Sequence, residues 1–534
     1  MKSRINQLSR HTADRRRGVW LIIPAFLFLA VCFFFALFMV AGHSTNHGDL
    51  VILAGAVLGL PALVVLALAF RQGLGHVRSG LAKLRWWHLP WALLLVGSLV
   101  FRIRSASEII SDPVDAWAGF RIGMDTLVAF ILLGRLAVRR TNWVGSMLRG
   151  VVGAITVFGL VCLASTFWSV FPAWTLYKSG EYLIDVALLA AIVETVESVE
   201  EYRRFFNWTW ALYGVLLLSV WKDVLLWPKE ALYGEIIAKG AAMSMRLDGV
   251  LPAVSANDIG AFSAVLGLLS LARLFPASDE KFNKSWYSVV LLGSLVTMVF
   301  AQTRSAFAAF VLGGIVILLF SKRSKLMTAL AFVGVPIAAI GTMGGLIWSF
   351  MERGQSGSQL ETMSSRSKWW GFAWETYLEK PFTGMGAYAG GRFAVMQQLG
   401  SGTTSTMHSD YLETIVGTGV WGMIALLVTL AAVGWLLLRY VRDRDLDPYA
   451  RQLAYEGLAI FAFLLFRSIF NDTFGYHPAL HFLAILGFAE YLRRRRKAVF
   501  QFARAPSAAD AIDEPDSQLE LVFSGGNPED LSSV

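Results

Sequence analysis

The chain has 534 residues, of which 56% are hydrophobic and 16% charged, and it carries a formal net charge of +9. This composition is too apolar for an ordinary soluble domain and indicates a membrane protein. The basic residues lie in short clusters between apolar runs, which argues against a nucleic-acid-binding face and favours a role in membrane topology. Cys32 and Cys162 both lie in apolar runs, so they predict neither a disulfide framework nor a cysteine metal site.

Long apolar runs predict an all-α protein, a polytopic transmembrane helix bundle of about 12 to 14 spans, because a helix needs about 20 apolar residues to cross the hydrocarbon core. The first run is too long for a removable signal peptide and lacks a cleavage site, so it is expected to be a retained span. The predicted spans cover residues 19–41, 50–70, 88–103, 119–137, 149–166, 176–194, 207–227, 256–275, 286–303, 305–321, 326–348, 410–438, 454–471 and 475–492.

Lysine and arginine clusters fix the expected orientation, since they are enriched in cytoplasmic loops. Placing the arm at residues 1–18 inside sends "RRTN", "SKRSK" and "RRRRK" to the same side and leaves both termini cytoplasmic. A polytopic membrane domain is expected over residues 19–497, with a long outward loop at 349–409. The tail at 498–534 is poor in aromatic residues and is expected to be disordered.

Arg246 lies in the outward stretch "MSMRLDGVLPAVSANDIG", ahead of a predicted span. Two other arginines expected to face outward, Arg304 and Arg366, are described next. Ser255 or Asn257 is expected to cap the helix that follows.

Arg304 stands between two nearly contiguous apolar runs in "VFAQTRSAFAAF", at a turn predicted to face outward. Positive charge is not needed there for topology, and the small neighbours Ser305 and Ala306 leave room beside it. Arg304 is either a helix-turn charge paired with a carboxylate or part of an anion site.

The long outward loop is the one soluble-looking insertion, and loops of such length usually carry function. Its apolar and aromatic residues recur at helical spacing from Arg366 to about Lys380, which predicts an amphipathic helix at the membrane interface. In the turn "PFTGMGAYAGG" that follows, Gly384 and Gly386 let the backbone approach a ligand closely. Alone, this turn is typical of a plain loop; with Arg366 and Lys368 nearby it also suits a phosphate.

The stretch "TMHSDYLE" places His408, Ser409 and Asp410 side by side at the start of an apolar run. Consecutive helical side chains point about 100° apart, so the three cannot form a relay in which one group orients the next. The outward loop offers no second histidine to complete a zinc site. Ser409 or Asp410 is expected to cap the helix, while His408 is either structural or a general base that titrates near neutral pH.

Two other patterns carry metal-binding residue types. Asp443 and Asp445 form an Asp-x-Asp, but they lie in an inward loop among arginines and are most simply a solvated charge run. His43, His47 and Asp49 lie within reach of one metal, yet a short polar turn is the simpler interpretation. No metal site is therefore predicted.

Four segments together resemble the O-antigen ligase and polymerase superfamily of bacterial inner-membrane proteins. They are "LASTFWSVFPAWTLYKSGEYL", "TRSAF", "SRSKWWGFAWETYLEKPFTGMGAY" and "HSDYLETIVGTGVWG". The third is similar to the family's Arg-x-x-x-Trp…Pro-x-x-Gly-x-Gly signature, and the last to its His-Ser/Asn-x-Tyr/Phe-Leu…Gly-x-x-Gly segment.

The resemblance implies a metal-independent glycosyltransferase without a cofactor, which moves a glycan from an undecaprenyl-diphosphate carrier to an acceptor sugar on the periplasmic face of the inner membrane. In a ligase the acceptor is the lipid A core. It implies that Arg304 and Arg366 stabilise the leaving diphosphate and that His408 deprotonates the attacking hydroxyl, giving inversion. Further residues expected to bind the diphosphate are Arg246, Lys368, Gly384 and Gly386. Membrane lipids are expected partners, and nucleic acid is not.

The sequence departs from the family pattern where an acidic residue often precedes the second glycine of the histidine segment. Thr418 stands there, so no acid acts at that point unless Glu413 or Asp410 substitutes. A polymerase of the same superfamily, extending the lipid-linked glycan itself, is the nearest alternative. A lipid-linked glycan transporter or flippase is more distant, because few charges deep within spans and no internal repeat are apparent.

Overall fold

The computed structural model describes residues 85–99, 106–112, 114, 116–138, 141–233, 245–322, 366–400, 406–474 and 479–504. Several sequence-based expectations lie outside the described residues. They are the arm at 1–18, the spans at 19–41, 50–70 and 326–348, most of the tail at 498–534, and the cluster of His43, His47 and Asp49.

The described chain is a bundle of helices with one short antiparallel pair of strands, which confirms the predicted all-α class. In chain order the elements are α3 (His88–Leu99), α4 (Ala106–Ser111), α5 (Ala116–Ala137), α6 (Trp143–Met147), α7 (Gly150–Ala164), η1 (Ser165–Trp168), α8 (Pro172–Thr195), α9 (Val199–Leu226), α10 (Pro228–Ala231), β1 (Leu232–Tyr233), β2 (Arg246–Leu247), α11 (Ala256–Leu274), α12 (Lys284–Ala301), α13 (Arg304–Phe320), α17 (Arg366–Glu379), the π-helical η3 (Gly390–Met396), α18 (Asp410–Arg442), α19 (Pro448–Arg467) and α20 (Leu480–Arg504).

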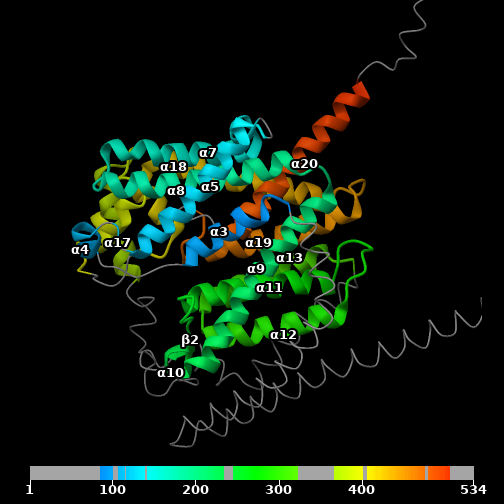
Figure 1. Ribbon diagram of the computed structural model, residues 1–534, viewed down its shortest axis with the longest axis horizontal. Helices are drawn as coiled ribbons and strands as arrows, with labels where there is room; N and C mark the ends of the chain where they lie inside the picture. Colours follow the sequence, from blue (N-terminus) through cyan, green and yellow to red (C-terminus); the bar gives the residue numbers. More distant parts are fainter. Residues whose placement is uncertain are drawn as a thin grey trace, which may run out of the picture.

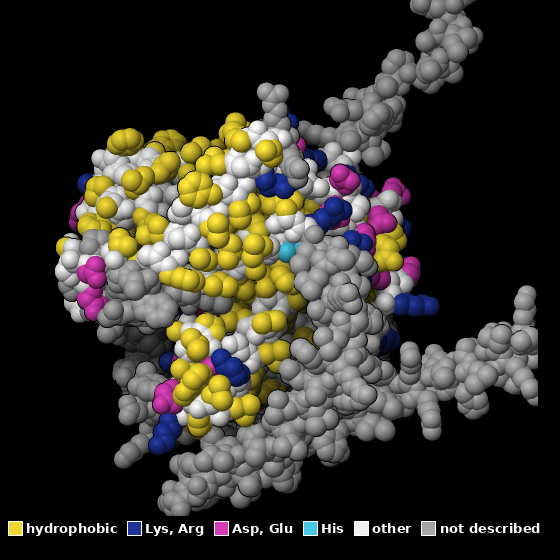
Figure 2. Space-filling model, in the orientation of Figure 1, with side chains coloured by type: hydrophobic (Ala, Val, Ile, Leu, Met, Phe, Trp, Pro, Cys, Tyr) yellow, Lys and Arg dark blue, Asp and Glu magenta, His cyan; other side chains and the backbone are white. Residues whose placement is uncertain are grey.

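Five of the described helices are long and apolar enough to cross a membrane: α7 with η1, α9, α11, α12 and α18. Helices α3 and α13 are shorter but also apolar. Exposed apolar side chains cover much of the face seen in Figure 2, while charged side chains gather toward its ends. A surface of this kind suits contact with lipid, in which helices satisfy their own backbone hydrogen bonds.

The helices pack lengthwise, with α7 against α8 and α18, and α11 against α12, α13 and α19. In Figure 1, α4, α10, α17 and β2 gather at the left end of the bundle. We call this the His408 end, because the turn before α18 lies there. Hydrogen bonds at this end join the loop after α19 to the first residues of both α11 and α13.

Three ion pairs mark the opposite end of the bundle. Lys322 and Asp279 lie 2.7 Å apart, Arg494 and Glu194 also 2.7 Å apart, and Arg273 bonds Glu456 at 2.9 Å. The loops after α11 and α13 therefore lie side by side at this end.

Helix α18 is broken near its first third by Gly419, whose backbone is left-handed at φ 63°. The turn after α17 satisfies the backbone groups that this kink releases. Val420 donates to the carbonyl of Pro381 at 2.9 Å, and the carbonyls of Val416 and Gly417 accept from Met385 and Gly386 at 2.8 and 2.9 Å. A neighbouring segment thus replaces the missing helical bonds, as a broken apolar helix requires.

Candidate functional site

The turn that carries His408 is fixed by its neighbours on both sides. The amide of Met407 donates to Oε1 of Glu413 at 2.6 Å, and its carbonyl accepts from the indole of Trp370 at 3.1 Å. His408 itself adopts a left-handed backbone at φ 54°. This conformation is uncommon for a side-chain-bearing residue and persists only where surrounding contacts determine it.

The imidazole of His408 is partly buried and lies in a positively charged environment. Its ring centroid is 6.3 Å from that of Trp369, and Nδ1 is 3.4 Å from the hydroxyl of Thr406. Burial, together with the cations of Arg366 and Arg467, lowers the pKa of His408 to about 4. His408 is therefore neutral at neutral pH, the form in which a histidine can accept a proton.

Arg366 begins α17, at the His408 end of the bundle. Its Nη1 donates to the carbonyl of Phe470 at 2.9 Å. Burial lowers the pKa of Arg366, Asp472 opposes that change, and the cation of Arg304 adds to it. Arg366 is thus close enough to interact electrostatically with both of the other residues that the sequence singled out.

Arg304 starts α13 directly after a tight turn. Gln302 ends α12 in a left-handed conformation at φ 51°, so the chain reverses between two apolar helices, as predicted. The neighbouring Ser305 accepts a hydrogen bond from Asn471 at 3.0 Å. The loop after α19 therefore touches both the Arg366 and the Arg304 segments.

That loop contributes residues that the sequence analysis overlooked. Arg467, at the end of α19, is 4% exposed and donates to the carbonyl of Asn257 at 3.3 Å and to Asp258 at 3.4 Å. Burial raises the pKa of Asp472 to about 6, although the Thr406 hydroxyl and Arg467 both act to lower it. The sequence analysis placed Arg467 inside the predicted span at 454–471. The polar residues near the outward end of that span indicated that the helix ends before residue 471.

Asp410 joins the start of α18 to the same loop. Its Oδ2 accepts from the amides of Thr473 and Phe474, the latter at 2.7 Å, and its own amide donates to the carbonyl of Ser468 at 3.0 Å. Ser409 occupies the N-cap position, but its side chain makes no capping bond. The prediction that Ser409 or Asp410 caps α18 is therefore wrong. The side chain of Asp410 binds the loop after α19 instead. Ser255 does cap α11, by accepting from Asp258, as predicted.

The glycines of the turn after α17 lie against α18 and the start of α8. Gly384 has φ +67°, and a Cβ there would come within 2.6 Å of the backbone of Gly417. Gly386 has φ +100°, and a Cβ there would collide with Ser169. Their amides donate to Lys380 and Gly417. The structure thus shows why both positions need glycine.

Arg246 and Lys368 lie at the His408 end without a direct contact to His408. Arg246, in β2, bonds Asp248 through Nε at 3.0 Å and Nη2 at 2.9 Å. Its neighbour Met245 accepts from Gln302 at 2.6 Å, which sets β2 beside the turn before Arg304. Lys368 is exposed on α17, two residues after Arg366.

Within the described residues, no group of three or more histidine, cysteine or carboxylate side chains is placed to hold a metal ion. Asp443 and Asp445 lie at the opposite end of α18, where Asp443 accepts from the amide of Asp445. Cys162 is a buried free thiol in α7.

Residues 289–427 match the family model described as O-antigen ligase. This match, to part of the chain, supports membership of the O-antigen ligase superfamily. A comparison with curated proteins found no match.

The match to the O-antigen ligase family runs from α12 to the first half of α18, and it includes Arg304, Arg366 and His408. Arg246 and Arg467 lie outside it. Because the family transfers glycans, by ligation or by polymerisation, the chain is a membrane transferase of that general type and acts in polysaccharide biosynthesis.

Proposed function

We propose that the protein transfers a glycan from an undecaprenyl-diphosphate carrier to the lipid A core, as an O-antigen ligase of the bacterial inner membrane with its site facing the periplasm. The observation that carries this proposal is the approach of Arg366 to both His408 and Arg304. A neutral base and two cations on neighbouring, partly buried segments suit displacement of a diphosphate leaving group.

In the proposed reaction, the acceptor hydroxyl attacks the anomeric carbon of the donor glycan. His408 takes the hydroxyl proton as the new bond to oxygen forms. The bond from the anomeric carbon to the diphosphate oxygen breaks, and its electrons remain on the diphosphate. Arg304 and Arg366 stabilise that charge, since guanidinium groups match phosphate oxygens in pairs. Direct displacement inverts the anomeric configuration.

The same cations couple donor binding to the strength of the base. Without the donor, Arg366 and Arg467 disfavour a proton on His408. An anionic diphosphate near these arginines would offset their charge and raise the pKa of His408. His408 would then become a stronger base when the leaving group is in place.

The remaining expectations fit this proposal in supporting roles. Lys368 would extend the cationic surface along α17, and Gly384 and Gly386 would shape the turn beside it. Arg246 would contribute from β2, next to the turn before Arg304. The loop at 349–409 would face the periplasm, with both termini in the cytoplasm.

The assignment is tested with Arg304→Ala, Arg366→Ala and His408→Ala in purified protein reconstituted with lipid-linked donor and lipid A core. Each variant should lose activity by about 10²-fold or more, because it removes a transition-state charge partner or the base. Arg204→Ala, which removes an exposed arginine at the opposite end, is the matched control and should remain active. Normal transfer by a folded His408→Ala protein would show the assignment to be wrong.

A polymerase of the same superfamily is the second candidate, because the family match covers both activities. It would lengthen the glycan on its carrier instead of moving it to the lipid A core. Product analysis separates the two: the proposal requires product on the lipid A core, whereas longer carrier-linked glycan would favour the polymerase. Activity should also persist with a chelator present.

A further inference from the structure

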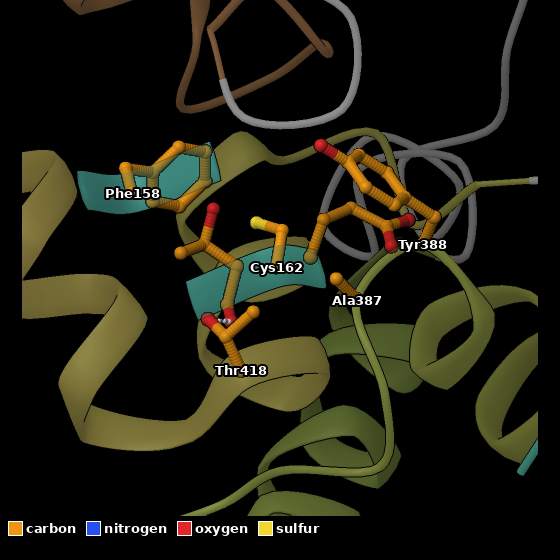
Figure 3. A pocket seen from close by; sticks show the side chains of 7 residues that line it. Phe158, Cys162, Ala387, Tyr388 and Thr418 are labelled. Carbon is orange, nitrogen blue, oxygen red and sulfur yellow. Dashed lines mark hydrogen bonds between the residues drawn. The ribbon is translucent and has the colours of Figure 1, made fainter. Parts of the chain in front are cut away.

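A small cavity lies beside the first turns of α18, the helix that follows the His408 turn. It is bounded by α7, by the segment after Gly386 and by the first turns of α18, and its lining includes Phe158, Cys162, Tyr388, Glu413, Thr414 and Thr418 (Figure 3). In Figure 3 the side chains of Cys162, Tyr388 and Thr418 surround the same space. The cavity has room for about one water molecule.

Two buried oxygens in this lining lack a hydrogen-bond partner among the described residues. They are Oε2 of Glu413 and the hydroxyl oxygen of Thr414. Glu413 is 5% exposed, and a Cβ at Gly391 would lie 1.9 Å from its Oε2. The carboxyl is therefore enclosed between η3 and α18. Buried polar atoms of this kind usually bind an ordered water when the space allows.

The other oxygen of Glu413 reaches the backbone beside His408. Oε1 accepts from the amide of Met407 at 2.6 Å, and the amide of Glu413 donates to the carbonyl of Ser409 at 2.9 Å. Glu413 thus holds the residue before His408 and the residue after it. These two bonds bracket a left-handed residue, which needs such support to keep its conformation.

Charged groups from its own helix and from two other segments lie within electrostatic range of the Glu413 carboxyl. They are Asp410 on its own helix, Asp472 in the loop after α19 and Arg392 in η3. The carboxyl is therefore connected to the loop that approaches Arg366 and Arg304, as well as to the His408 turn.

We propose that the cavity binds one ordered water, shared by Glu413 and Thr414, and that Glu413 held in this way is the positioning residue for His408. The inference rests on the proposed function, because it assigns Glu413 a role through the base. Glu413 does not touch the substrate; it sets where the imidazole points.

The central test compares Glu413→Gln with Glu413→Ala in the reconstituted transfer assay. Glutamine keeps an oxygen that can accept from Met407, so its activity should stay within about 5-fold of the wild type. Alanine removes that acceptor and should lower kcat by about 10- to 100-fold with a smaller change in the donor KM, since misplacement of a catalytic group mainly affects the chemical step. Glu375→Ala, which changes an exposed carboxylate of α17, is the matched control and should be unaffected.

Each alternative result is informative. Wild-type activity in Glu413→Ala would overturn the positioning role, and loss of activity in Glu413→Gln equal to that in Glu413→Ala would show that the charge, not the hydrogen bond, is needed. If Glu413→Ala does not fold, Glu413→Gln compared with Glu413→Leu, scored by the ratio of kcat to donor KM, decides the same question. An active His408→Ala protein would instead remove the proposed function itself.

The water is tested separately by Thr414→Val and Thr414→Ser. Serine keeps the hydroxyl and should be as active as the wild type, whereas valine keeps the shape, removes one water partner and should lower kcat by about 2- to 5-fold as one buried hydrogen bond is lost. A density map that resolves waters should show a peak between Glu413 and Thr414. An empty cavity in that map would overturn the water, and equal activity of both variants would overturn its part in positioning.

Discussion

His408 is a histidine that burial and two arginines keep uncharged. The lowered pKa, about 4, means that the side chain stays neutral through the physiological range. Asp472, whose pKa burial raises to about 6, faces Arg467 and the Thr406 hydroxyl in the same region. Proton uptake on His408 is therefore governed by its burial and by residues from α17 and α19.

This environment predicts the ionisation of His408 in the donor-free protein. Because the pKa is lowered, the neutral form persists as the pH falls through 6.5 and is lost only near pH 4. NMR of histidine-labelled protein in detergent should show one signal that titrates near pH 4 and disappears in His408→Ala. A titration of that signal near pH 6.5 would mean that the imidazole is solvated, contrary to the structure.

At the scale of single elements, α18 and the turn after α17 depend on each other. The kink at Gly419 opens the helix, and the segment from Pro381 to Gly386 supplies the bonds that close it again. This pairing places α17, and with it Arg366, over the first turn of α18. Glycine is required at the kink because its φ is 63° and a Cβ would lie 2.4 Å from the carbonyl oxygen of Phe382.

Gly419→Ala is accordingly expected to destabilise the protein. The left-handed conformation alone costs alanine about 1–2 kcal/mol, and the collision with Phe382 adds to it. Gly293→Ala is the control, since a Cβ at that helical position meets nothing, and alanine there should be neutral or stabilise by up to about 1 kcal/mol. Thermal unfolding in detergent measures both; equal melting temperatures would contradict the packing described.

On the scale of the whole molecule, buried charges are paired across helices. Arg273 of α11 bonds both oxygens of Glu456 of α19 and also reaches Tyr287 and Asn207. Near the other end, Arg121 of α5 and Lys178 of α8 share Glu181. The sequence analysis expected few charges deep within spans, but the described helices contain both of these charged groups. Pairing with an opposite charge lowers the free-energy cost of burying each of them.

Glu456→Ala should be strongly destabilising, by about 3–5 kcal/mol, because it leaves the cation of Arg273 buried without its carboxylate. Asp279→Ala breaks the exposed pair with Lys322 and should have no measurable effect. Unfolding curves of the two purified variants test this contrast. Similar curves would mean that water reaches Arg273 and that the pair contributes little.

The sequence predicted most of the helices because their apolar runs are long and their ends are marked. The run at 256–275 became α11, capped by Ser255, and the aromatic stretch after Arg366 became α17. The ends of α9 and α19 were predicted less well, since both helices begin earlier, within polar residues: α9 at Val199 and α19 at Pro448. Apolar length alone does not detect such helical turns.

The site was predictable as a set of residue types but not as an arrangement. Arg304, Arg366 and His408 were identified from their local sequence. Their positions relative to one another depend on the loop after α19, in which Asn471 donates to Ser305 and the carbonyl of Phe470 accepts from Arg366. The pairing of Arg246 with Asp248 and the buried Arg467 likewise follow from tertiary contacts. No spacing rule relates positions more than a hundred residues apart.

The loop after α19 also bears on when the protein becomes competent during synthesis. Residues 467 to 474 are among the last described parts of the chain to leave the ribosome, yet they hold Asp410, Arg366 and Ser305 in register. Earlier helices can insert without them, but the histidine turn lacks its anchors until this loop arrives. A nascent chain that ends with the family-matched segment would lack these anchors, so the proposed transfer would begin only once the last helices are in place.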